Sequence, residues 1–237
     1  MPLLVRTWNL FHGNADPPER RAYLEQMVRL VTGDAPDVVC LQEVPVWALA
    51  RLGRWSGMAA FGAVAARPRL GSATVGRVLT ELHHGWLRSA VTGQANAILV
   101  DRRHRVTGAW AEPISRRREG ERRVCQAVRL RETGLVANFH ASSAHAAPQV
   151  LRAAAVVDGL AGPGEPVLLC GDFNFRSADG SGYAELRARG FSEPAPGIDQ
   201  ILVRGAPASE PVAWPDARRR AGSRRLSDHA PVELTVG

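Results

Sequence analysis

The chain has 237 residues, of which 45% are hydrophobic and 22% charged, values typical of a globular protein that buries a sizeable core. Thirty Lys and Arg residues against twenty-three acidic ones leave a net charge of +7, and every one of the thirty is an arginine. The absence of lysine excludes P-loop phosphate binding, lysine Schiff bases and Ser-x-x-Lys hydrolases, so any phosphate must be handled by arginine, backbone amides or a metal.

Strand-like and helix-like segments alternate along the whole chain. Apolar residues at helical spacing predict helices over 24–31, between Pro17-Pro18 and Gly33, over 148–160, and less regularly over 75–82. Short apolar, β-branched runs predict strands, which in chain order cover residues 3–8, 37–41, 97–100, 124–130, 135–139, 167–170, 198–203 and 232–236. Residues 53–71 show no clear pattern.

The order of these elements indicates the fold class. Successive strands between residues 97 and 139 lack crossover helices, which favours antiparallel pairing and argues against a doubly wound parallel sheet. We therefore predict a single α/β domain over residues 1–237. It is a four-layer sandwich in which two mixed, mostly antiparallel sheets pack face to face with helices outside. The 124–130 strand alternates between apolar residues and arginines, which predicts that it is half exposed.

Cysteine usage and the apolar pattern indicate the compartment. Cys40, Cys125 and Cys170 are an odd, widely spaced set inside apolar runs, which argues against a disulfide framework and for a reducing environment. The N-terminus reaches Arg6 too soon for a signal peptide. No apolar run approaches the roughly 18 residues of a membrane span. These features predict a cytoplasmic protein without a membrane span, and no segment indicates an obligate protein partner.

Polar residues capable of chemistry stand at the ends of six predicted strands. Four strands end in polar residues and two begin with them, and if the last two run antiparallel to their neighbours all six groups meet at one edge of the sandwich. The residues at these ends are Asn9, Glu43, His140, Asp172 with Asn174, Asp199, and Asp228 with His229. Four carboxylates, two histidines and two asparagines exceed what capping of strands requires.

The six segments resemble the endonuclease/exonuclease/phosphatase superfamily, which includes deoxyribonucleases, abasic-site endonucleases, sphingomyelinases and inositol-polyphosphate phosphatases. They read Thr-Trp-Asn9, Leu-Gln-Glu43-Val, Asn-Phe-His140, Gly-Asp172-Phe-Asn174, Ile-Asp199-Gln-Ile-Leu and Ser-Asp228-His229-Ala-Pro, in the family's order. The resemblance implies a phosphoesterase that depends on a divalent metal, with Mg²⁺ as the expected ion and Mn²⁺ as a possible substitute.

The resemblance also implies roles for these residues. Glu43 matches the principal metal ligand, with Asn9 and Asp228 as further contributors, because Mg²⁺ prefers carboxylate and amide oxygens. Asp172 matches the residue that activates the attacking water, and Asn174 a contact to the phosphate. His229, oriented by Asp199, is expected to donate to a non-bridging oxygen.

Three further assignments are less direct. His140 matches a second family histidine near the leaving group, but its usual acidic partner has no counterpart in the sequence. Arg123 matches a phosphate-binding arginine, and Asn96 lies near a position that binds substrate. Two departures concern the substrate: Phe11 replaces an acidic residue that some members carry, and no tyrosine lies where many nucleases have one.

The favoured substrate is nucleic acid. Residues 116–123 and 218–225 are arginine-rich and are predicted to form exposed loops, and the second loop precedes Asp228 directly. The alternative is the same chemistry on a small phosphoester such as a phospholipid head group or an inositol phosphate. A non-catalytic nucleic-acid-binding domain is a further alternative, but carboxylates without a metal would repel phosphate there.

Overall fold

The computed structural model describes residues 2–19, 21–68, 92–176 and 180–237, and their strands form two large sheets. Strands of the first sheet are β1 (Leu3–Asn9), β3 (Val38–Val44), β4 (Ala59–Ala66), β5 (Gln94–Val100), β11 (Val212–Ala213) and β14 (Val232–Val236). Strands of the second are β6 (Val106–Pro113), β7 (Val124–Leu130), β8 (Gly134–His140), β9 (Val167–Asp172) and β10 (Asp199–Arg204). Their orders are β11-β14-β1-β3-β5-β4 and β10-β9-β8-β7-β6.

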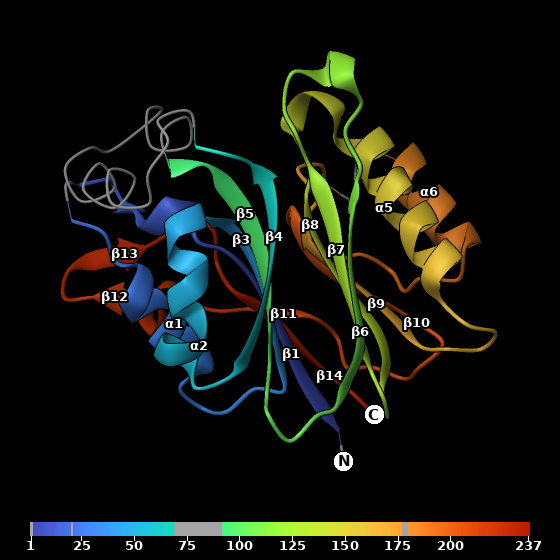
Figure 1. Ribbon diagram of the computed structural model, residues 1–237, viewed down its shortest axis with the longest axis horizontal. Coiled ribbons are helices and arrows are strands. Elements are labelled where there is room, and N and C mark those ends of the chain that lie inside the picture. Colours follow the sequence, from blue (N-terminus) through green and yellow to red (C-terminus); the bar gives the residue numbers. More distant parts are fainter. Residues whose placement is uncertain (1, 20, 69–91, 177–179) are drawn as a thin grey trace.

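The two sheets pack face to face and carry helices on their outer faces (Figure 1). The first sheet is covered by α1 (Leu24–Thr32) and α2 (Leu49–Ser56), and the second by α5 (Ala146–Leu160) and α6 (Ser181–Ala188). A small third sheet joins β2 (Ala15–Asp16), β12 (Arg220–Ala221) and β13 (Arg224–Leu226). The predicted four-layer α/β sandwich is thereby confirmed.

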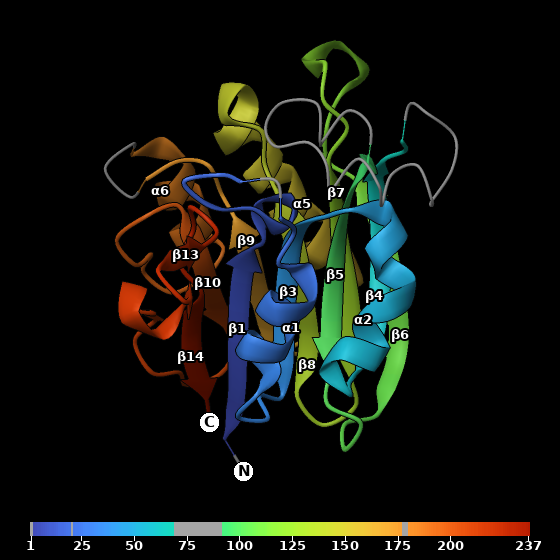
Figure 2. The same ribbon diagram turned by 90° about the vertical axis from the view of Figure 1, so that its left-hand side faces the viewer.

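Strand directions bring particular chain ends to one edge. Strands β1 and β3 pair in parallel, as do β8 and β9, whereas the other pairs within the large sheets are antiparallel. The carboxyl ends of β1, β3, β8 and β9 therefore lie at the same edge as the start of β10, at the top in Figure 2. The predicted mixed, mostly antiparallel pairing is confirmed.

Apolar side chains fill the space between the sheets and beneath the helices. Buried residues between the sheets include Val5, Cys40, Ile98, Val136 and Leu168. Because side chains alternate along a strand, the neighbouring positions face the helices and form two further apolar layers. In the described part of the chain, no helix combines the length and apolar character needed to traverse a bilayer.

A polar bridge of buried amide side chains also links the two sheets. The Nε2 of Gln42 donates to Thr7 Oγ1 at 2.9 Å and, across the interior, to Asn138 Oδ1 at 2.7 Å. The Nδ2 of Asn138 donates back to the carbonyls of Leu41 at 3.0 Å and Ala97 at 2.9 Å. Both amides are fully buried, so hydrogen bonds with fixed directions set the position of one sheet against the other.

The prediction that the 124–130 strand is half exposed is wrong. On the face predicted to be exposed, Cys125 and Ala127 are buried in the apolar layer beneath α5. Arg129 on that face is held at the margin, where its guanidinium binds Glu165 at 2.7 Å and the carbonyl of Leu160 at 2.6 Å. An arginine in this strand therefore marks the border of a helix-covered face.

Several elements lack a counterpart among the predicted ones. Residues 53–71, which show no clear sequence pattern, include the end of α2 and the whole of edge strand β4. Strand β6 and helix α6 were not predicted either. The helix predicted around residues 75–82 lies outside the described residues.

Candidate active site

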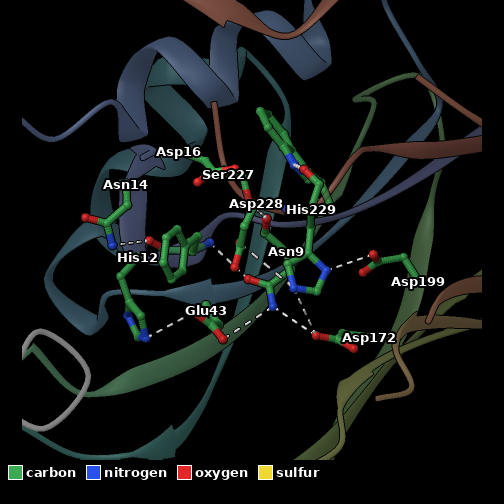
Figure 3. Close-up of polar contacts among 12 residues, drawn as sticks. Asn9, His12, Asn14, Asp16, Glu43, Asp172, Asp199, Ser227, Asp228 and His229 are labelled. Carbon is green, nitrogen blue, oxygen red and sulfur yellow. Dashed lines mark hydrogen bonds and ion pairs between the residues drawn. The ribbon is translucent and has the colours of Figure 1, made fainter. Parts of the chain in front are cut away.

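The six polar segments predicted to meet do come together at one edge of the sandwich, and Figure 3 shows five of them, all but the segment of His140. Asn9 ends β1 and Glu43 lies near the end of β3, while His140 and Asp172 are register partners at the ends of β8 and β9. Asp199 pairs with Asp172 across β10 and β9. Each sheet thus contributes part of one site.

Asn9 connects the two sheets within this site. Its Nδ2 donates to Asp172 Oδ2 at 3.0 Å and to Glu43 Oε1 at 3.3 Å, and its Oδ1 accepts the backbone N–H of Phe11 at 2.9 Å. Glu43 has φ +52°, a left-handed conformation next to an irregularity in the pairing of β3 with β5. That conformation interrupts the strand where the Glu43 carboxylate enters the site.

Asp172 is buried and is contacted from several sides. Its Oδ1 accepts the backbone N–H of Asn174 at 3.0 Å, and the Nε2 atoms of His140 and His229 lie 3.4 and 3.8 Å from its Oδ2. Burial raises the pKa of Asp172 to about 7, and the neighbouring charge of Asp199 adds to the effect. The Asp172 carboxyl group is thus suited to exchange protons near neutrality.

A glycine makes this placement of Asp172 possible. Gly171 has φ +143°, and a Cβ on it would lie 1.9 Å from the carbonyl oxygen of Phe139 on β8. Only glycine allows the two backbones to approach so closely at this point. The Gly171-Asp172 pair therefore sets how near the Asp172 carboxylate lies to the end of β8.

His229 forms the predicted pair with Asp199. Its Nδ1 lies 2.8 Å from Asp199 Oδ2, within the expected hydrogen-bond range. Burial alone lowers the pKa of His229, but the hydrogen bond and charge of Asp199, with Asp172 and Asp228 nearby, raise it to about 10. His229 is therefore an imidazolium at neutral pH, and its Nε2 faces the site as a charged donor.

His140 has the opposite protonation state. Its Nδ1 lies 2.9 Å from Gln94 Nε2 and 3.2 Å from Arg123 Nη1. Because both neighbours are donors, Nδ1 must accept, and the ring proton lies on Nε2, which faces Asp172. Burial, with the charge of Arg123, lowers the pKa of His140 well below its usual range. An amide and a guanidinium thus lie against Nδ1, with the Oε1 of Glu43 farther away at 3.8 Å.

The loop that carries Asp228 and His229 is held from beneath by Arg219. The buried Nη1 of Arg219 donates to three carbonyl groups of this loop, and its Nη2 pairs with Asp216 at 2.6 Å. The three acceptors are the carbonyls of Leu226, Ser227 and His229, at 3.2, 2.9 and 2.9 Å. Residues 218–225 were predicted to be an exposed loop; for Arg219 this is wrong, because its guanidinium is a buried scaffold.

Replacing Arg219 by alanine is expected to destabilise the protein by about 1–3 kcal/mol, because buried carbonyl groups lose their donor. The matched control is Arg220→Ala: this exposed neighbour donates only to the carbonyl of Ser223, so its loss should change stability by less than about 0.5 kcal/mol. Urea denaturation of both variants measures the difference. Equal midpoints for Arg219→Ala and the wild type would contradict the scaffold role.

The remaining predicted residues occupy distinct positions. Asn174 (φ +54°) donates from its side chain to the carbonyl of Ala141 at 2.8 Å, and so shapes the loop after β9. Asp228 is the most exposed of the four carboxylates, with 44% of its side chain accessible. The side chain of Asn96 donates to the carbonyl of Val124 in the opposite sheet at 3.1 Å, and not to a residue of the cluster around Asn9. Instead Gln94, two residues earlier on β5, reaches His140.

Two site neighbours were not predicted. His12 Nε2 lies 3.3 Å from Glu43 Oε2, and His12 stands in a tight turn at φ +50°. Its position three residues after Asn9 and next to Gly13 was the available sequence signal. Gln94 begins β5, which runs antiparallel to β3, so a polar residue at a strand start was the corresponding signal there.

Comparison with known families identifies this arrangement. The sequence model of the Endonuclease/Exonuclease/phosphatase family matches residues 7–229, a range that includes every residue of the site. The chain belongs to the endonuclease/exonuclease/phosphatase family. Members of this family are metal-dependent phosphoester hydrolases, so the chain is a hydrolase of phosphoric ester bonds that depends on a divalent metal.

Solved structures share the fold at low sequence identity. An endonuclease/exonuclease/phosphatase from Beutenbergia cavernae aligns with a TM-score of 0.72 and 17% identity over 99% of this chain and 71% of its own. TDP2 from Caenorhabditis elegans gives 0.64 and 18% over 100% and 74%. A mannosyl-6-phosphatase from Bacteroides thetaiotaomicron gives 0.63 and 16% over 99% of both chains. A search of curated proteins found no match.

The donor atoms at this edge fit a hard divalent cation. One group of possible ligands is Asp172, Asp199 and His229, whose donor atoms lie within 4.8 Å of one another. However, His229 is protonated and its Nδ1 is bound to Asp199, which makes it a poor ligand. The carboxylates of Glu43 and Asp228 are more accessible and offer the oxygen donors that Mg²⁺ or Mn²⁺ takes.

Proposed function

We propose that the chain is a Mg²⁺-dependent phosphodiesterase that acts on nucleic acid by in-line attack of water on phosphorus. The observation that carries the proposal is the meeting of Glu43, Asp172 and the charged His229 around the amide of Asn9. Phosphoester hydrolysis needs positive charge on the phosphate, a base for water and a stabilised leaving oxygen. These side chains offer all three within one site.

In this proposal Glu43 and Asp228 hold the ion, while Asn9, expected as a further ligand, orients Glu43 through its Nδ2 and directs its Oδ1 to the N–H of Phe11. Bound Mg²⁺ supplies positive charge that polarises the phosphate, and Mn²⁺ is able to substitute for it. The Glu43 carboxylate is partly accessible, and the amide of Asn9 fixes its orientation. The raised pKa of Asp228, which has burial as its main cause, fits a carboxylate that gains from a nearby cation.

The protein groups then divide the chemistry between them. His229 donates from Nε2 to a non-bridging oxygen as charge develops there, and Asp199 fixes its ring through Nδ1. Asp172 takes the proton of the attacking water as the new P–O bond forms. Neutral His140 donates a hydrogen bond from Nε2 to the departing oxygen as the old P–O bond breaks, and that oxygen takes its proton from water. Asn174 and Arg123 are proposed to contact the phosphate, and Asn96 supports the rim through Val124.

Nucleic acid is the favoured substrate because of charge. The net charge of +7 attracts a polyanion, and several exposed arginines lie within residues 116–122, directly before Arg123. The alternative, a small phosphoester, is supported by the structural likeness to a mannosyl-6-phosphatase, which spans both chains almost fully. The two readings use the same site and differ only in what contacts the substrate outside it.

A hydrolysis panel with Mg²⁺ and with Mn²⁺ tests the proposal. It includes single- and double-stranded DNA, RNA, abasic DNA, sphingomyelin, inositol phosphates, a sugar monophosphate and a chromogenic diester. We expect a polynucleotide to be hydrolysed with the highest kcat/KM, and the chromogenic diester slowly. A sugar or inositol monophosphate cleaved faster than every polynucleotide would contradict the nuclease assignment and favour the small-substrate alternative.

A further inference from the structure

The two arginine-rich segments of the chain use their charges differently. In residues 218–225 the arginines are paired within the protein. Their partners are Asp34 and Glu233 for Arg218, Asp216 for Arg219, the Ser223 carbonyl for Arg220, Glu19 for Arg224, and Asp16 with Asp216 for Arg225. Arg218 also stacks on Trp214, 3.5 Å from the ring centre. Four of the five arginines in this segment are therefore paired with carboxylates, so it offers less free positive charge than its composition suggests.

Residues 116–122 show the opposite pattern. Arg116, Arg117, Arg118 and Arg122 are exposed, and none of them forms an ion pair with any residue in the described ranges. The acidic neighbours are already engaged, since Glu119 binds Arg152 and Gln149, and Glu121 binds Arg123. The positive charge of this segment is therefore available to a ligand.

Three of these arginines, all but Arg118, line a pocket, here called the basic pocket, with a volume of about 490 Å³. Its walls include Arg116, Arg117, Arg122 and Arg123 on one side, and Val64 with Ala65 from β4 on the other. Among the lining residues in the described ranges, Glu121 is the one carboxylate, against four arginines. Guanidinium groups bind phosphate through paired N–H donors, so this lining suits a phosphate.

Arg123 connects the basic pocket to the active site. Arg123 is one of the lining residues of the pocket, and its Nη1 lies 3.2 Å from Nδ1 of His140. The Arg123 side chain is 9% exposed, and its buried Nε has no hydrogen-bond partner. A buried guanidinium with a spare donor, between the site and three free arginines, is a built element of an anion site.

We propose that the basic pocket binds a further phosphate of a polynucleotide, next to the phosphate that reacts. The inference rests on the proposed phosphodiesterase function. It adds the direction in which the bound polynucleotide runs, because the polynucleotide would leave the active site past His140 and Arg123. In residues 218–225, by contrast, four of the five arginines are paired with carboxylates. Recognition in the basic pocket is electrostatic and independent of base sequence.

The test compares two triple variants that lose the same charge. Arg116→Ala, Arg117→Ala and Arg122→Ala empty the basic pocket of its exposed arginines. Arg54→Ala, Arg105→Ala and Arg131→Ala are the matched control, because these exposed arginines also lack ion-pair partners in the described ranges and lie away from the pocket. Binding of a single-stranded phosphorothioate oligonucleotide of about twelve nucleotides is measured with Mg²⁺ by fluorescence anisotropy at several salt concentrations.

The basic pocket binds one phosphate, and each lost phosphate contact removes about 0.7 from the slope of log affinity against log salt for single strands, so the slope of the pocket variant should fall by about 0.7. If the plots for the variant and the wild type meet at 1 M salt, binding near 0.1 M salt should be about fivefold weaker. The control variant should keep nearly the wild-type slope. Equal slopes for the two triple variants would overturn the proposal. So would a pocket variant that loses binding to anionic phospholipid vesicles but keeps the wild-type affinity for the oligonucleotide.

Failure of the pocket and failure of the proposed function give different results. Anisotropy reports binding without turnover, whereas hydrolysis of a small chromogenic diester reports the metal and histidine site. A wild-type protein that fails to cleave the diester contradicts the phosphodiesterase, and the salt slopes still decide on the pocket. In the pocket variant we expect oligonucleotide affinity to fall far more than diester hydrolysis.

Discussion

Replacing His229 by alanine is expected to lower turnover by a factor on the order of 10² to 10⁴, the range typical for loss of a positioned donor. The reason lies in its environment: Asp199 holds Nδ1 at 2.8 Å, and the raised pKa of about 10 keeps the ring charged at neutral pH. Steady-state kinetics on the best substrate measure the loss. His229→Gln, which keeps an N–H donor without the charge, should fall between the alanine variant and the wild type.

The chain offers a matched control for this experiment. His104 forms a similar pair with Asp37, in which Nε2 of His104 lies 2.6 Å from Oδ1 of Asp37. Asp37 directly precedes β3, so this pair lies at the opposite end of that strand from Glu43. His104→Ala removes the same kind of pair far from the chemistry, so kcat should stay close to wild type. A His229→Ala enzyme with wild-type turnover would remove His229 from the mechanism.

Removal of the divalent metal is expected to abolish hydrolysis, and addition of Mg²⁺ or Mn²⁺ to restore it. Glu43→Gln should weaken metal affinity at least about tenfold, since even residues outside the ligand shell have effects of that size. Isothermal titration calorimetry measures the affinity directly, without reference to activity. Glutamate and glutamine side chains are nearly identical in shape, so the loss of metal affinity measures the contribution of the Glu43 carboxylate charge.

Glu210→Gln serves as the control for Glu43, because Glu210 is exposed and lies in the loop before β11. Its metal affinity should equal that of the wild type. Full hydrolysis in excess chelator would contradict metal dependence altogether. Wild-type metal affinity in Glu43→Gln would leave the metal requirement standing and assign the ligand role to other carboxylates.

The sequence predicts this site well because strand ends are easy to recognise. An apolar run that stops at a polar residue shows both the strand and its terminus, and Asn9, Glu43, His140 and Asp172 all stand at such points. Whether all six ends share one edge depended on strand direction, which the predicted antiparallel pairing supplied. The Asp199–His229 contact followed from that direction.

Other features depend on contacts that no local pattern shows. Strands β4 and β6 lie at sheet edges, and their residues alternate between more and less exposed positions. Alanine stands on both faces of β4, and in β6 glycine stands at a less exposed position and alanine at exposed ones, so the sequence does not show a clear alternation of apolar and polar residues. Arg219 stands within a run of arginines, where composition predicts exposure, and only the three carbonyls around it show otherwise. The tautomer of His140 follows from Gln94 and Arg123, which are distant in sequence.

The polar bridge between the sheets has a consequence for the accuracy of catalysis. Asn9 and Glu43 belong to one sheet, and His140, Asp172 and Asp199 to the other, so any slippage between the sheets changes every distance between the two groups. Apolar contacts alone resist such shear weakly because they have no preferred direction. An error of about 1 Å in placement is enough to slow an enzyme about a hundredfold. The hydrogen bond between the fully buried Gln42 and Asn138 therefore helps to keep the two halves of the site at fixed distances from each other.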